Sequence, residues 1–158
     1  MPRRPPSLTG IFPKLSPSNH AITSAQTTRY NCVAWVFDDT TQAWEYSTRP
    51  EKYWPPGIPQ DGSVEAYVEL FRNRGYAECS DATLESGLEK LALFVHERFG
   101  FGHVAWQAAD GTWWSKLGDS FDITHDSLDV LEGAGLDDYG TARLIMMRPR
   151  RCTRACPF

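Results

Sequence analysis

Two residues of this sequence, a cysteine and a histidine, have the surroundings that nucleophilic catalysis requires. Cys32 comes after a stretch rich in Thr and begins the apolar segment 32–38. In the first turn of a helix, unpaired N–H groups and the positive end of the helix dipole favour a thiolate. His103 follows Gly100-Phe101-Gly102 and begins a second apolar segment. If the fold brings Cys32 to His103, the thiolate can attack an amide while the imidazole transfers protons.

Each residue also has a structural interpretation. A lone Cys in an apolar segment is commonly a small buried side chain, and His103 can be a half-buried strand residue held by a backbone carbonyl. The catalytic hypothesis needs a polar side chain that orients the imidazole, and donors for an oxyanion. Asp122 is the preferred orienting residue and Ser115 is the second choice. The backbone N–H of Cys32 is the expected first oxyanion donor.

The hairpin after His103 decides which residue shares its face of the sheet. A two-residue turn at Asp110-Gly111 pairs Ala105 with Lys116, whereas a three-residue loop at 109–111 pairs Ala105 with Ser115. Because side chains alternate along a strand, one register places Lys116 beside His103 and the other places Ser115 there. The other residues expected to contact the oxyanion or a substrate are Gln26, Tyr30, Trp35 and Lys116.

The first half of the chain contains two expected helices. Residues 32–38 are apolar and free of Gly and Pro, which favours a short buried helix. Residues 47–62 are rich in Pro and form an irregular loop. An amphipathic helix begins at Val64, where Asp61 or Ser63 is the expected N-cap, and Gly75 ends it.

The second half is typical of a sheet. Strands are expected at 91–96, 103–108, 113–117 and 141–147, with a short helix at 126–132 that begins near His125. Asp122 falls in the loop after the third of these strands. Helices followed by consecutive strands indicate an α+β fold with an antiparallel sheet.

Length and charge limit the classes of function. The chain has 158 residues and a formal net charge of −4, which favours one domain and argues against nucleic acid as a partner. We expect an extended arm at 1–20, a single domain at 21–149 and a basic tail at 150–158. The basic groups Arg3-Arg4 and Arg148, Arg150, Arg151 and Arg154 are interpreted as solvated.

Several further absences are expected. No apolar leader or membrane-spanning run is visible, so a cytoplasmic location, or export without a cleaved signal peptide, is expected and no membrane partner. The four Cys do not form a disulfide framework. The spacing of Cys152 and Cys156 is too loose for a zinc half-site, so neither a metal nor a cofactor is expected.

Two short motifs carry a resemblance. Asn31-Cys32-Val33-Ala34-Trp35-Val36 resembles the nucleophile motif (Asp/Asn)-Cys-Ser-Gly-(Phe/Trp)-Val of the NlpC/P60 cysteine peptidases. The segment 102–106 (GHVAW), followed by 109–111 (ADG), resembles their histidine strand and hairpin. Gln26 stands six residues before Cys32, at the spacing of the papain oxyanion glutamine. The resemblance implies a papain-like α+β fold, in which an N-terminal helix carrying the Cys packs on an antiparallel sheet.

A longer pattern, over residues 22–148, resembles a mostly bacterial family with YNC-x-AW, YWPPG, SKLG and DI-x-H signatures and no assigned activity. The NlpC/P60 resemblance implies a cysteine hydrolase or acyltransferase acting on an amide of a peptide-like substrate, with peptidoglycan stem peptides as the first guess. Ser115 stands where those enzymes carry a second polar residue, often His. The alternatives are a non-catalytic binding module on the same fold, and an effector that modifies a protein side chain.

Overall fold

The structure, a computed structural model, describes residues 8–47 and 52–151. In chain order the elements are α1 (Leu8–Ile11), β1 (His20–Ser24), α2 (Cys32–Val36), β2 (Ala43–Trp44), β3 (Lys52–Tyr53), α3 (Val64–Asn73), β4 (Ala77–Cys79), β5 (Leu88–His96), β6 (Gly100–Gln107), β7 (Trp113–Lys116), β8 (Asp122–His125), a 3₁₀ helix η1 (Asp129–Leu131) and β9 (Thr141–Pro149). None of the described helices has the length and hydrophobicity needed to cross a membrane.

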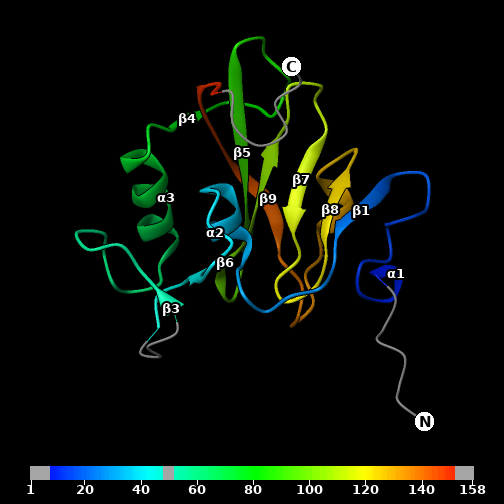
Figure 1. Cartoon of the computed structure of the whole chain (residues 1–158), viewed down its shortest axis with the longest axis horizontal. Coiled ribbons are helices and arrows are strands. Elements are labelled where there is room, and N and C mark those ends of the chain that lie inside the picture. The colour runs from blue at the N-terminus through cyan, green and yellow to red at the C-terminus, as the bar shows by residue number, and fades with distance from the viewer. Residues whose placement is uncertain (1–7, 48–51, 152–158) are drawn as a thin grey trace.

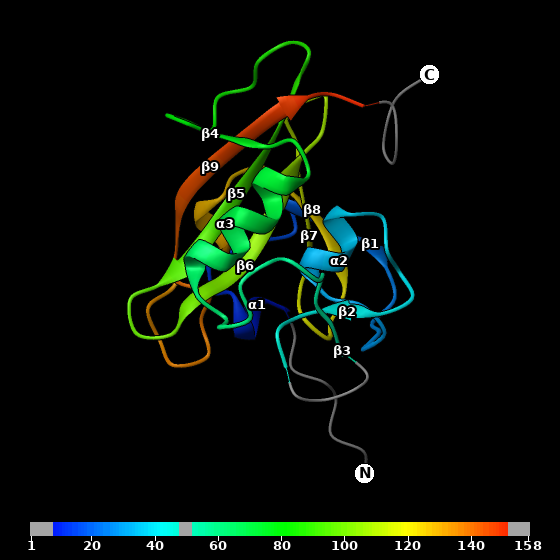
Figure 2. The same ribbon diagram turned by 90° about the vertical axis from the view of Figure 1, so that its left-hand side faces the viewer.

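Seven strands form one antiparallel sheet in the order β1-β8-β7-β6-β5-β9-β4. The short strands β2 and β3 pair in parallel beside it. Helices α2 and α3 cover one face of the sheet, and α1 lies on the other side (Figure 1, Figure 2). The expected α+β class with an antiparallel sheet is therefore confirmed.

The two main helices begin where their sequences predict, although α2 ends at Val36 and not at residue 38. Asn31 is the N-cap of α2, and its Oδ1 accepts hydrogen bonds from Ala34 N and Trp44 N, both 3.1 Å. Ser63, one of the two expected caps, accepts from Ala66 N at 3.1 Å and begins α3. Gly75 follows α3 with φ 93°, a left-handed conformation that glycine adopts without strain.

The two faces of the sheet have separate cores. On β5, Leu91 and Leu93 point toward α2 and α3, whereas Ala92 and Phe94 point away. We call the first side the helix face and the second the opposite face. Both faces are covered, so β5 is an almost continuously apolar strand, as expected for residues 91–96.

The N-terminal part of the chain differs from the predicted arm. Leu8, Phe12 and Leu15 are buried in the core of the opposite face, and β1 extends the sheet beside β8. Residues 8–20 are thus part of the domain and are not an extended arm, because three apolar side chains find a surface to cover. Residues 1–7 lie outside the described residues.

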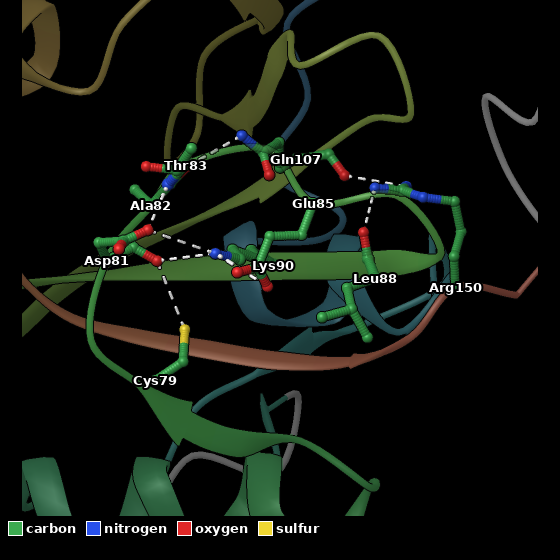
Figure 3. Close-up of polar contacts among 9 residues, drawn as sticks. All are labelled: Cys79, Asp81, Ala82, Thr83, Glu85, Leu88, Lys90, Gln107 and Arg150. Carbon is green, nitrogen blue, oxygen red and sulfur yellow. Dashed lines mark hydrogen bonds and ion pairs between the residues drawn. The ribbon is translucent and has the colours of Figure 1, made fainter.

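The basic residues near the C-terminus also differ from the prediction. Arg148 forms an ion pair with Glu89, which is 1 % exposed. Arg150 donates to Leu88 O at 2.7 Å and to Gln107 O at 3.1 Å (Figure 3). These two residues are therefore bound to the sheet and are not a solvated tail. Residues 152–158, with Arg154, lie outside the described residues.

A buried lysine fastens the loop between β4 and β5. Lys90 is 1 % exposed, and its ammonium donates to Asp81 O at 2.9 Å. It also lies 3.6 Å from Asp81 Oδ1 and 3.6 Å from Glu85 Oε2 (Figure 3). Cys79 donates to the same Asp81 carbonyl, and Gln107 Nε2 donates to Ala82 O. The loop supplies the acceptors for Lys90, so we interpret the cluster as structural, although Gln107 Oε1 is buried without a hydrogen-bond partner in the described residues.

Candidate functional site

Cys32 is the first residue of α2, as the sequence predicts, but it is buried. Its side chain is part of the helix-face core, together with Tyr67, Val104 and Trp106, and the residue is 8 % exposed. Burial raises the pKa of the thiol to about 11, even though hydrogen bonds from the backbone of Val104 and Val33 lower it. Desolvation therefore outweighs the helix start, and the thiol stays protonated at neutral pH.

His103 lies on the opposite face of β6 and is fully buried. Its ring stacks on Tyr139, with centroids 4.4 Å apart and planes 6° apart, and meets Phe94 edge-on. His103 Nε2 lies 2.9 Å from Ser115 Oγ, which in turn lies 2.8 Å from His125 Nε2. The hydroxyl of Ser115 thus joins two imidazoles in a buried chain.

The structure does not bring Cys32 and His103 together. Helix α2 packs on the face of β6 that carries Val104 and Trp106, and Trp35 of α2 contacts Trp106. Successive residues of a strand point to opposite sides, so His103 and Ala105 face away from α2. Ala105 is small and would leave room for a helix beside His103. Helix α2 docks instead over Val104 and Trp106, and the sheet separates the proposed nucleophile from its proposed base.

The hairpin has the three-residue register. Ala108 N donates to Thr112 O at 2.8 Å, and Gln107 pairs with Trp113. Gly111 has φ 89°, as this loop requires. Ser115 therefore shares the face of His103, and Lys116 faces the helices. Ser115 contacts the imidazole as the second-choice orienting residue, although it does so away from Cys32.

Asp122 does not orient His103. It is the first residue of β8 and does not lie in a loop. It pairs with Lys116 of β7, and both side chains point to the helix face. Its Oδ2 accepts a hydrogen bond from the hydroxyl of Tyr30 at 2.7 Å. Tyr30 thereby ties the segment before α2 to the sheet, which is a positioning contact and not an oxyanion contact.

Lys116 has a similar role. Its ammonium donates to the carbonyls of Thr27, Gly118 and Ser120 at 2.6–2.9 Å, and it lies 5.2 Å from the Tyr30 ring centroid. Burial lowers the pKa of this lysine, while nearby Asp122 raises it. Three carbonyls occupy the three donors of the ammonium, so Lys116 is a clamp for two loops.

The last two predicted residues are also structural. Gln26 Nε2 donates to Ser120 Oγ at 3.4 Å at the surface. Trp35 is 5 % exposed and stacks on Trp114, with centroids 6.1 Å apart and planes 16° apart. Six of the predicted residues (Gln26, Tyr30, Cys32, Trp35, Lys116 and Asp122) therefore gather around α2 and its preceding segment, apart from His103 and Ser115.

Two residues of the histidine chain were not predicted. His125 was expected at a helix start, but it ends β8 opposite Trp113, and its Nδ1 donates to Ser127 O, 2.8 Å away. Tyr139 comes from the segment before β9 and covers His103. Residues 122–125 (DITH) contain one strongly apolar residue, Ile123, so no alternation of apolar and polar residues marks this strand in the sequence.

Burial also determines the charge of the two imidazoles that Ser115 joins, those of His103 and His125. It lowers the pKa of His125 from 6.5 to about 4, with a smaller opposing effect from Ser127. Burial lowers the pKa of His103 well below 6.5, and His125 adds to the effect. Both imidazoles are therefore neutral at physiological pH. Among residues 8–47 and 52–151, no cluster of three or more metal-ligating side chains is present.

A surface groove lies at the far end of the β5–β6 hairpin, and we call it the hairpin groove. It has a volume of about 390 Å³ and is bordered by the hairpin turn and by the segment that leads into β9. The lining residues are Val95, His96, Glu97, Arg98, Gly133, Ala134, Leu136, Gly140, Thr141 and Arg143.

The walls of the hairpin groove are held by backbone contacts. Gly133 and Gly140 pair through two hydrogen bonds of 3.0 and 2.9 Å, and His96 Nε2 lies 2.9 Å from Gly135 O. A Cβ at Gly140 would lie 2.1 Å from Val95 O, so only glycine allows this close approach. The loop 133–140 is thereby fixed against the hairpin.

The fold and the buried clusters define an α+β domain built on a seven-stranded antiparallel sheet with α2 and α3 on one face. Residues 21–147 match the family model described as a domain of unknown function, DUF7689. The match spans most of the 158 residues, so the chain belongs to this family. Comparisons with curated proteins and with solved structures gave no match.

Proposed function

We propose that this domain is a non-catalytic binding module for a partner protein, and that the hairpin groove receives a peptide segment of that partner. One observation carries the proposal. The two most exposed large hydrophobic side chains of the described chain are Leu136, at 68 %, which lines this groove, and Phe99, at 57 %, which follows the lining residue Arg98. Phe99 packs against the ring of His96, which lines the groove, at 4.9 Å. Exposed apolar groups gathered at one cavity are typical of an interaction site.

The charges at the groove specify the partner further. Arg98 and Arg143 line it and outnumber Glu97. Within the described part of the chain, neither guanidinium forms an ion pair, although Arg98 lies over the Phe99 ring. A segment with an apolar side chain next to a carboxylate would therefore match both the apolar and the basic parts of the groove.

The alternative is the papain-like cysteine hydrolase, or side-chain-modifying effector, that the NlpC/P60 resemblance implies. The position of Cys32 at the start of a helix on an antiparallel sheet favours it. A buried thiol with a pKa of about 11, and a histidine on the opposite face, disfavour it. Acyl transfer needs the thiolate and the base within hydrogen-bond reach of each other.

The test is a selection from a phage-displayed library of random peptides against the full chain. Peptides with an apolar residue beside Asp or Glu should be enriched. Their affinity should fall at least tenfold with Leu136→Ser and with Arg143→Gln. Ile22→Ser is a matched control, because Ile22 is 53 % exposed but lies on β1, away from the groove. That variant should bind as the unaltered protein does.

Two results would contradict the proposal. Peptide binding that is equally weakened by Ile22→Ser and Leu136→Ser would remove the hairpin groove from consideration. Cleavage of the selected peptides, detected by mass spectrometry and abolished by Cys32→Ser, would favour the hydrolase.

A further inference from the structure

A second cavity lies at the opposite end of β9, where the C-terminal ends of α2 and α3 meet the sheet. It has a volume of about 470 Å³. Its lining residues are Val36, Phe37, Asp38, Asn73, Arg74, Gly75, Arg148 and Arg151. We infer that this arginine cavity is a binding site for a small phosphate- or carboxylate-bearing molecule. The inference is independent of the proposed function, because the hairpin groove shares no residue with this cavity.

The guanidinium of Arg74 is held in place without an acidic partner. It lies 5.3 Å from the ring centroid of Phe37 and 5.3 Å from that of Trp44. No carboxylate of the described chain lies within ion-pair distance of it. Stacking on aromatic faces restrains a guanidinium and leaves its N–H edge available for an anion.

Arg148 is oriented by three contacts. Its Nε pairs with the buried Glu89, its Nη1 donates to Arg74 O at 3.0 Å, and its guanidinium carbon lies 4.3 Å from the Tyr76 ring centroid. Its Nη2 donates to no acceptor in the described residues. An arginine whose other groups are fixed loses little side-chain entropy when it binds an oxyanion.

The helix ends do not cancel this positive charge. The side chains carry one net positive charge, because Asp38 and the Glu89 that pairs with Arg148 offset two of the three arginines. A helix places at most about half a negative charge at its C-terminal end, on carbonyls that lack a partner. The carbonyls at both ends are already occupied by backbone N–H groups. Asp39 N donates to Ala34 O at 2.9 Å after α2, and Tyr76 N donates to Phe71 O at 3.1 Å after α3. The cavity therefore keeps a net positive charge, which suits an anion.

The experiment measures binding of two probes, inorganic phosphate and malonate, to the full chain by calorimetry. Sodium chloride at equal ionic strength is the reference. At least one probe should bind with a measurable Kd and raise the Tm above the chloride reference. Tighter binding of phosphate indicates a phosphorylated ligand, and tighter binding of malonate indicates a carboxylate. Equal Tm values in all three salts would overturn the inference.

Variants locate the site. Arg74→Gln and Arg151→Gln should each weaken the Kd at least tenfold. Arg148 is left unaltered because its loss would leave Glu89 buried without a partner. Arg72→Gln is the matched control, because Arg72 is on the same helix and pairs with Glu69 and Glu78 outside the cavity. Binding that weakens equally in Arg72→Gln and Arg74→Gln would show a diffuse charge effect and would refute the site.

Discussion

The buried chain of His103, Ser115 and His125 makes the stability of the domain depend on pH between 7 and 5. Both imidazoles are neutral in the folded protein, because burial lowers their pKa values. In the unfolded chain they regain an ordinary pKa near 6.5. Acidification therefore protonates the unfolded state first, and the free energy of unfolding falls.

The size of the effect follows from His125. The pKa of His125 is lower in the folded protein than in the unfolded chain, so its contribution to stability is complete above pH 6.5. This contribution is lost as the pH falls toward the folded pKa of about 4. At pH 5 the imidazole is protonated in the unfolded chain and neutral in the folded protein. Because pH 5 lies about 1.5 units below the unfolded pKa, the free energy of unfolding falls by about 2 kcal/mol. For a domain of this size that loss lowers the Tm by about 4–8 °C. His103 adds a further decrease in the same direction.

Thermal unfolding followed by circular dichroism at pH 7, 6 and 5 tests this reasoning. Carboxyl groups interfere little, because the unfolded pKa values of Asp and Glu, about 4, lie below this pH range. His125→Gln removes one titrating group, so its Tm should decrease less between pH 7 and 5. His96→Gln is the control, since it leaves both network histidines intact. A wild-type Tm that is constant from pH 7 to 5 would refute the argument.

Three other outcomes are expected. In the native protein, brief iodoacetamide treatment at pH 7 should label the partly exposed Cys79 before the buried Cys32, as read by mass spectrometry of the peptides; prior labelling of Cys32 would reopen the catalytic hypothesis. His103→Ala should lower the free energy of unfolding, measured by chemical denaturation, by about 2–4 kcal/mol, because it removes the stack on Tyr139 and the partner of Ser115. The same variant should leave the labelling of Cys32 unchanged. Lys90→Ala should expose the loop 80–87 to limited proteolysis, whereas Lys52→Ala, which removes a surface ion pair, should not.

Local signals in the sequence were sufficient for much of the fold. The Ser63 cap, the apolar stripe and Gly75 define α3 within one turn, and the apolar run 91–96 identifies most of β5. The short edge strands were not predicted. In β1, His20–Ser24, three residues are exposed, and apolar and polar residues hardly alternate. β8 was read as a loop, since its four residues include polar side chains on both faces.

The candidate site could be predicted only in part, for a reason that lies in the sheet. Both faces of β6 are covered, so the side chains on both faces are buried. The hydrophobicity of the residues therefore does not show which face contacts α2. Ala105 offered space for a helix, whereas Val104 and Trp106 offered a surface that interlocks with Trp35. The second arrangement buries more aromatic area. The register of the hairpin was left open between two loop lengths, and the structure has the three-residue loop.

The ends of the sheet have a consequence for self-association. A long, flat edge strand exposes unpaired backbone groups that recruit other chains. Here one edge is β4, which has three residues, and the other is β1, which has five and is interrupted by an irregularity between Ile22 and Ser24. Neither edge offers a long regular template. The long strand β5 is interior, with four strands on one side of it and two on the other in the sheet order. The domain should therefore resist strand-to-strand aggregation even at high concentration.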